Sequence, residues 1–286
     1  MKKERSDIDL TEMHERRKRR KRFTVVLLAA LGIYVLLLAT ALIVLKSPVF
    51  RVQSVSVVGN AAIASGSILD VVRSDALQGP WRPVKAMLGF QNMLIWPHAL
   101  KTSSLALIPG VARVTLAKDY SARSIVVNVT ERSPYGIWCF APAPPGGQNA
   151  TSTGLPGSAP CWWFDDGGIL FAHAAGASNN VFTTVYDYSQ PGGSLRSAML
   201  PAEFIPNAFS IFRVLRSSGL VIDEIALRDL ALEELEADVH NGPKLYFSLR
   251  FPADDDLAAI QSLAAKTGFS KIGYIDLTVR DRVYYK

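Results

Sequence analysis

The chain has 286 residues, of which 49% are hydrophobic, and a formal net charge of +6 at pH 7. Residues 1–23 hold ten Lys or Arg against five Asp or Glu, and the rest of the chain holds twenty-one against twenty. The main body is therefore nearly neutral, which argues against nucleic acid as its partner. Two cysteines are too few for a disulfide-framework protein. Beyond the tail and an apolar segment, about 240 residues remain for one large or two ordinary domains.

The N-terminal region has the pattern of a membrane anchor. Residues 23–45 carry no charge, and as a helix they span roughly 34 Å, enough to cross a hydrocarbon core of about 30 Å. A basic run at 16–22 precedes this segment and only Lys46 follows it, which places the N-terminus (residues 1–22) in the cytoplasm and the body outside. The alternative is a signal peptide cleaved near Ala41. The long region before the apolar run, and the continuation of that run past Ala41, favour an uncleaved anchor.

Residues 46–133 predict a small α+β unit with the order strand, helix, helix, strand, strand. Alternating apolar residues, turn residues and a helix cap are the signals for these elements. We expect the helices to cover one face of a three-stranded sheet. The predicted elements are a strand over 50–58 that ends at Gly59-Asn60, a helix beginning at Ser65, a weaker helical stretch over 93–107 interrupted by Pro97, and strands over 111–117 and 124–131.

Residues 134–286 predict a mostly antiparallel β domain with flanking helices. Residues 141–160 are rich in Pro, Gly, Ser and Thr and indicate a flexible insertion. Alternating segments around His240-Asn241-Gly242-Pro243 predict a hairpin. The other predicted elements are short strands over 135–140, 161–164 and 169–172, a helix over 203–217, a helix that starts at Asp254-Asp255-Asp256 and ends at Gly268, and a last strand from Tyr274.

The chain contains no recognisable pattern for catalysis, for a cofactor or for a metal. Its four histidines are scattered, without the spacing of a zinc site. Lys266-Thr267-Gly268 matches the Lys-Thr-Gly motif of penicillin-binding enzymes. These enzymes also need a Ser-x-x-Lys motif with the nucleophilic serine, which this sequence does not have. We therefore predict a protein that is not an enzyme and needs no cofactor.

Several short motifs, in this order and spacing, resemble the FtsQ/DivIB family of bacterial cell-division proteins. Each motif is weak alone, and the match extends over about 240 residues from the tail to the last strand. The hairpin turn at 118–122 and Thr278 depart from the family pattern. The matching positions are Gly59-Asn60, Pro109-Gly110-Val111, Glu131-Arg132-Ser133-Pro134, the set Asp165, Gly168 and Phe171, and the ending from Gly273 to Lys286.

The resemblance implies a fold, a location and a function. Residues 46–133 would form a POTRA domain (β-α-α-β-β) and residues 134–286 the family's C-terminal β domain. The protein would be a single-pass protein of the bacterial cytoplasmic (inner) membrane, concentrated at the division septum. It would act as a non-enzymatic scaffold of the divisome that links early and late division proteins. Its implied partners are FtsB-like and FtsL-like single-pass proteins and other divisome membrane proteins.

The end of the chain is the predicted partner-binding element. Apolar and polar residues alternate from Tyr274, so one face can pack on a sheet while the other stays open. A terminal strand with open hydrogen-bonding groups is a template for an added strand. An ordinary edge strand that binds nothing is the alternative, and the resemblance favours binding. The predicted residues are Tyr274, Ile275, Asp276, Leu277, Thr278, Val279, Arg280, Arg282, Val283 and Tyr284.

Cys139 and Cys161 lie in strand-like segments on either side of the insertion. We predict a disulfide between them, which an extracytoplasmic body permits and which would close the base of the insertion. Two unrelated buried thiols are the alternative. A rival function uses one of these cysteines as the nucleophile of a membrane-anchored cell-wall hydrolase or transpeptidase, with His173 as the base.

Overall fold

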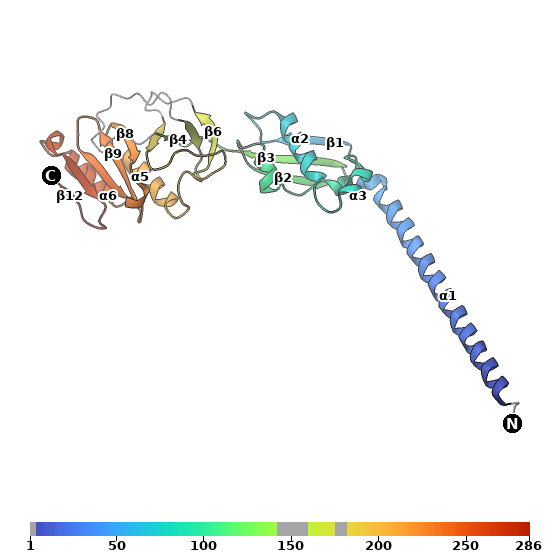
Figure 1. Ribbon diagram of the computed structural model, residues 1–286. Helices are drawn as coiled ribbons and strands as arrows, with labels where there is room; N and C mark the ends of the chain where they lie inside the picture. The colour runs from blue at the N-terminus through green and yellow to red at the C-terminus, as the bar shows by residue number, and fades with distance from the viewer. Residues whose placement is uncertain (1–3, 142–159, 175–181) are drawn as a thin grey trace. The chain divides into compact units, whose positions relative to one another are not determined.

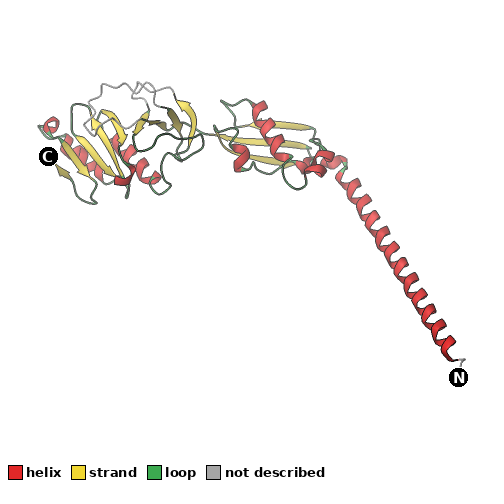
Figure 2. Ribbon diagram, in the orientation of Figure 1, coloured by secondary structure: helices red, strands yellow, loops and turns green. Residues whose placement is uncertain are grey.

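The computed structural model describes residues 4–141, 160–174 and 182–286, and it is a mixed α/β chain with two sheets (Figures 1 and 2). The expected flexible insertion at 141–160 lies outside the described residues, apart from its two end positions. The chain divides into two compact units, made of residues 1–58, 69–100 and 115–128 and of residues 59–68, 101–114 and 129–286.

Helix α1 (Glu4–Leu45) is the one helix in the described part of the chain that is long and apolar enough to cross a membrane. The apolar span covers Lys18–Ile43, and none of its side chains is buried against protein. The hydroxyls of Thr24 and Thr40 donate to carbonyls three and four residues earlier in the same helix. The helix thus satisfies its own polar groups, as a lipid environment requires.

The first sheet has the strand order β1-β3-β2, and β1 runs parallel to β3. The apolar residues Ile125 and Val127 of β3 are fully buried, as are Ile68 and Val72 of α2, which lie four apart on one helix face. The elements are η1 (Pro48–Phe50), β1 (Ser54–Val58), α2 (Ser65–Ala76), α3 (Arg82–Leu88), η2 (Met93–Ile95), α4 (Thr102–Leu105), β2 (Val111–Asp119) and β3 (Ser124–Glu131).

The structure differs from the prediction in this region at the start of the first strand and in one additional helix. The first strand begins at Ser54 and not at residue 50, because a 3₁₀ turn that starts at Pro48 includes Phe50. The helical stretch over 93–107 is two short turns, since Pro97 cannot continue a helix. Helix α3 was not predicted, because Gly79-Pro80 indicates a break; the helix starts directly after it, with Pro83 in its first turn.

The second sheet has nine strands in the order β12-β11-β10-β9-β8-β7-β4-β5-β6. Five of its eight neighbouring pairs are antiparallel, and the pairs β4–β7, β7–β8 and β10–β11 are parallel. The strands are β4 (Gly136–Phe140), β5 (Cys161–Phe164), β6 (Leu170–Ala174), β7 (Thr183–Asp187), β8 (Ile222–Leu227), β9 (Glu234–Val239), β10 (Lys244–Ser248), β11 (Tyr274–Leu277) and β12 (Tyr284–Tyr285).

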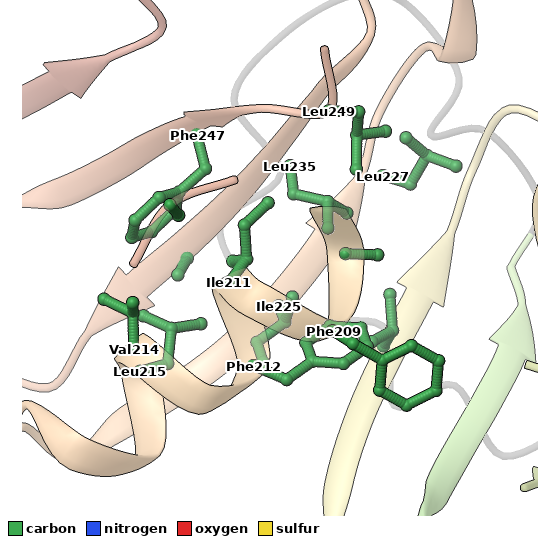
Figure 3. Packing of buried hydrophobic residues seen from close by; sticks show 14 of the residues in the cluster. Phe209, Ile211, Phe212, Val214, Leu215, Ile225, Leu227, Leu235, Phe247 and Leu249 are labelled. Atoms are coloured by element: carbon green, nitrogen blue, oxygen red, sulfur yellow. The ribbon is translucent and has the colours of Figure 1, made fainter. Parts of the chain in front are cut away.

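Helices α5 (Ile205–Ser217) and α6 (Asp256–Ala264) pack on one face of this sheet and enclose the main core (Figure 1). Helix α5 points its apolar face at the strands (Figure 3). Phe212 from the helix and Phe247 from β10 are among the largest fully buried side chains. The face of the sheet away from these helices carries polar residues on β9 and β10 and a small buried apolar cluster on β4 and β5.

Candidate partner-binding edge

The terminal hairpin, residues 274–286, forms one edge of the nine-stranded sheet. Strand β11 pairs in parallel with β10, and the short strand β12 pairs with β11 in antiparallel register, with Tyr284 opposite Asp276 and Tyr285 opposite Ile275. Tyr274 and Lys286 exchange backbone hydrogen bonds of 3.3 and 3.4 Å. The predicted binding element is thus the outermost strand pair of the sheet.

The alternation of this pairing leaves backbone groups of β12 free on its outer side. In an antiparallel pair, residues that exchange hydrogen bonds alternate with residues whose N–H and C=O groups point away from the partner strand. Lys286 bonds to Tyr274, so the neighbouring residue, Tyr285, directs its N–H and C=O away from β11. These are the groups to which a further strand would pair.

The predicted binding residues divide into a buried and an exposed set. Ile275 and Leu277 are 0% and 1% exposed, and they belong to the main core. Val279 does not continue this face: the strand ends at Leu277, and Val279 is 44% exposed in the turn. Val283 is half-buried against the core. Ile275, Leu277 and Val283 hold the hairpin on the core. The other predicted residues are the ones available to contact a partner.

The exposed set consists of tyrosines and arginines. The rings of Tyr274, Tyr284 and Tyr285 are exposed, and that of Tyr274 makes an edge contact with Tyr246 of β10. Within the described chain, neither Arg280 nor Arg282 forms an ion pair. Tyrosine and arginine are enriched at protein interfaces. Tyr285, like Tyr284, was expected from the sequence to offer contact area, whereas Tyr246 was missed, although the alternation over 245–251 places it on the outer face.

Acidic residues lie next to the hairpin, on the face of β9 and β11 that points away from the core. Asp276 is opposite Tyr246, which in turn is opposite Glu236 of β9. Burial and the charge of Asp276 raise the pKa of Glu234. Burial acts to lower the pKa of Lys244, but the carboxylates of Asp238 and Glu236 raise it overall. This face is therefore an acidic strip whose carboxylates are partly neutralised by Lys244 and by Arg228, which pairs with Glu236.

The Asp276 side chain shapes the turn that follows β11. Its Oδ1 accepts hydrogen bonds from the backbone N–H of Thr278 at 2.9 Å and from the hydroxyl of Thr278 at 2.6 Å. Asp281 then adopts a left-handed conformation with φ of 59°. Such local side-chain bonds end a strand and fix a turn. Asp276 and Thr278, which are both partly buried, therefore position the arginine-bearing turn.

Cys139 and Cys161 lie directly opposite each other on β4 and β5 and are joined by a disulfide. Both are buried, with Ile137 as their buried neighbour. His173 stacks on Trp162, with ring centroids 3.8 Å apart. A thiolate nucleophile needs a free and accessible cysteine, and the described structure offers neither cysteine in that form.

The motif at Gly59-Asn60 is tied to the motif at Glu131. The Glu131 carboxylate accepts hydrogen bonds from the backbone N–H groups of Ala61, Ala62 and Ile63, at 2.9–3.0 Å for the shortest bond to each. These bonds lower its pKa. Gly59 has φ of +85°, and a Cβ there would lie 2.2 Å from the carbonyl oxygen of Val129. Both motifs therefore serve the fold of the loop before α2.

A second pair of motif residues forms a buried ion pair. Arg132 binds Asp165, and their side chains are only 10% and 6% exposed. The other oxygen of Asp165 accepts hydrogen bonds from the N–H groups of Gly167 and Ile169 at 3.1 and 2.8 Å. The sequence singled out both residues without predicting that they meet.

In the described part of the chain, no group of three or more His, Cys, Asp or Glu side chains is arranged to hold a metal ion. The chain matches no protein-family model, and the search of curated proteins finds no match. The assignment of a function thus depends on the geometry above and on the motifs in the sequence.

Proposed function

We propose that this protein is a membrane-anchored scaffold of the FtsQ/DivIB type, without enzymatic activity, whose terminal hairpin binds FtsB-like and FtsL-like division proteins. The main support for this proposal is the structure of the terminal hairpin. It is the edge of a large sheet, it directs the backbone of Tyr285 outward, and it exposes three tyrosines. An edge of this kind is suited to β-augmentation, in which main-chain bonds give affinity and side chains give specificity.

Three further features support the proposal. The first sheet and its helices follow the order β1, α2, α3, α4, β2, β3, which is the strand order of a POTRA domain with one additional helical turn, α4, before β2. Helix α1 supplies a candidate anchor, and the basic run at 16–22 favours a cytoplasmic N-terminus and a body on the outer side. Arg280 and Arg282 provide positive charge for acidic groups of a partner helix. The proposed location is the septal region of the cytoplasmic membrane.

The test compares two variants at one position in the full chain, co-expressed with the FtsB-like and FtsL-like proteins. Tyr285→Ala and Tyr285→Pro both remove the ring, but only proline removes the outward N–H group. One lost hydrogen bond should weaken binding of the proline variant by roughly 3- to 10-fold relative to the alanine variant. Co-purification and a binding titration measure this difference.

A truncation after Val279 provides the larger effect, because it removes β12 and both arginines. We expect it to abolish binding. Unchanged binding by a truncated protein with a normal circular dichroism spectrum would exclude the hairpin as the interface. Val283→Asp is a poor substitute, since Val283 packs on the core and its loss would also destabilise the domain.

A further inference from the structure

Helix α3 and the loop after it expose an unusual number of large apolar side chains. The helix has seven residues and buries none of them. A helix this short is not stable by its own hydrogen bonds and normally depends on packing of its apolar face. Trp81 and Met87 are 68% and 59% exposed. The α3 surface comprises Trp81, Val84, Met87, Phe90 and Leu94.

The side chains of this surface that belong to the helix and its N-cap share a face by helical geometry. Residues three and four apart lie on the same side of a helix, which groups Trp81, Val84 and Met87 with Leu88. Ala86 lies on the opposite side of the same turn. The apolar side chains thus form a stripe along one side of α3, and this side is suited to contact an apolar medium.

The α3 surface lies next to the end of the proposed membrane anchor (Figure 1). The side-chain amide of Asn92 donates a 2.6 Å hydrogen bond to the carbonyl of Leu45, the last residue of α1. The backbone N–H of Val52 donates to the carbonyl of Gln91 at 2.8 Å. Leu45, Met87 and Leu88 line the same shallow cavity. If α1 leaves the hydrocarbon core near Leu45, α3 lies at the level of the lipid headgroups, because two of its residues line a cavity together with this end of α1.

The loop after α3 is held firmly enough to fix this position. The indole N–H of Trp96 donates to the carbonyl of Phe90 at 3.0 Å, and the two rings make an edge contact. Trp96 itself is buried. The oxygen of the Asn92 side chain accepts a hydrogen bond from the N–H of Leu94 at 2.9 Å. Asn92 thus connects the anchor to the segment that bears the apolar residues.

The charge of this region fits an anionic lipid surface. Residues 76–118 contain no Asp or Glu, and Arg82 and Lys85 lie within α3 itself. Basic residues close to a membrane are attracted by anionic headgroups, at about 1 kcal/mol each. Tryptophan prefers the boundary between water and hydrocarbon, where its ring is buried and its N–H stays hydrated. An apolar stripe with basic neighbours is the pattern of a helix that lies in this boundary.

We propose that the α3 surface docks into the headgroup region of the outer leaflet of the membrane that α1 crosses, and that it binds anionic phospholipid there. The contact would give the first compact unit a second attachment beside the anchor. This proposal depends on the membrane anchor and is independent of partner binding by the terminal hairpin, so either can fail without the other.

The test uses the full chain in liposomes that contain phosphatidylglycerol. Both native cysteines are in the disulfide, so Met87→Cys or Ala86→Cys introduces a single free thiol for a nitroxide label. Spin relaxation by oxygen, which concentrates in lipid, is compared with relaxation by a water-soluble nickel chelate. We expect the label at position 87 to be oxygen-accessible and protected from nickel, and the label at position 86 to be nickel-accessible.

Equal nickel access at the two positions, in protein with a normal circular dichroism spectrum, would overturn docking. The variant Lys85→Gln tests the headgroup claim on the Met87→Cys background, and Arg82→Gln is its matched control, because Arg82 lies four residues before Ala86 on the side that we expect to face water. We expect Lys85→Gln to increase nickel access at position 87 towards that at position 86, and Arg82→Gln to leave it unchanged. Unchanged protection in Lys85→Gln, or equal protection in liposomes of phosphatidylcholine alone, would overturn the role of anionic lipid.

Discussion

The internal motif contacts of Glu131 and Arg132 and the terminal hairpin were singled out by the same family resemblance, yet their physical settings are opposite. Glu131 and Arg132 make internal bonds that close a loop and neutralise a buried carboxylate. The hairpin exposes tyrosine rings, arginines and backbone groups at a sheet edge. The first set is therefore explained by folding alone. The second set, at the hairpin, leaves a sheet edge and tyrosine rings open to unwanted association unless a partner covers them. It is therefore the better candidate for function.

This contrast predicts that substitutions in the first set destabilise the protein, and the largest effect is expected at Arg132. Arg132→Ala would leave the Asp165 carboxylate buried without its counter-charge, at a cost of about 3–5 kcal/mol. Arg213→Ala is the matched control, because Arg213 and Asp254 form an ion pair that is 57% and 52% exposed. Removing an exposed pair costs about 0–1 kcal/mol.

Thermal unfolding of the full chain in detergent, followed by circular dichroism, measures both variants. Similar melting temperatures for Arg132→Ala and Arg213→Ala would contradict a structural role for the Arg132–Asp165 pair. The comparison with the hairpin would then fail, because a motif residue with little effect on stability becomes a candidate for function.

A glycine comparison gives a smaller effect and isolates a steric cause. Gly59 and Gly79 both have left-handed backbones, with φ of +85° and +100°, but only at Gly59 would a Cβ meet another atom. An Ala at either position pays the backbone cost of about 1–2 kcal/mol. Gly59→Ala must also displace the carbonyl of Val129, so we expect a total of about 3 kcal/mol. Equal losses of stability in the two variants would show that the loop relaxes around the added methyl group.

Local patterns in the sequence predicted the elements whose partners lie nearby in the chain. The hairpin of β9 and β10 follows from two alternating segments around a turn, and the structure pairs Leu235 with Phe247 as this pattern requires. Helix α5 follows from its apolar spacing. The two strands of the hairpin are neighbours in the chain, and the backbone bonds of a helix join residues four apart, so in both cases a short stretch of sequence contains the whole signal.

Strands β7 and β8 were not predicted, because their position depends on distant partners. Strand β7 pairs in parallel with β4, and β8 pairs in parallel with β7; a parallel pair has no tight turn to mark it in the sequence. The same limit applies to the candidate site. The alternation from Tyr274 predicted the inward Ile275 and Leu277, but only the pairing with β12 shows that Tyr285 directs its backbone outward.

The smallest expected effect concerns a charge that links the terminal hairpin to helix α6. Burial, with the nearby charges of Asp255 and Asp281, raises the pKa of Asp256 from 3.8 to about 6. Asp281 lies in the hairpin turn, so the two acids repel each other when both are ionised. Between about pH 4 and pH 6 the folded state binds a proton that the unfolded state has lost. Stability therefore falls as the pH rises through this window.

Asp256→Asn should remove this dependence. At pH 7.5 we expect the free energy of unfolding of the variant to exceed that of the native chain by about 1 kcal/mol. This gain is smaller than the free energy that corresponds to the full pKa shift, because the side chain is only half-buried and because a negative charge is favourable at a helix N-terminus. At pH 3.5 Asp256 is protonated in the folded state, so the gain should disappear. Melting temperatures of the two proteins across pH 3.5–7.5 measure the effect. A constant difference across the range would show that the substitution acts through packing, and the hairpin turn would then exert no electrostatic strain on α6.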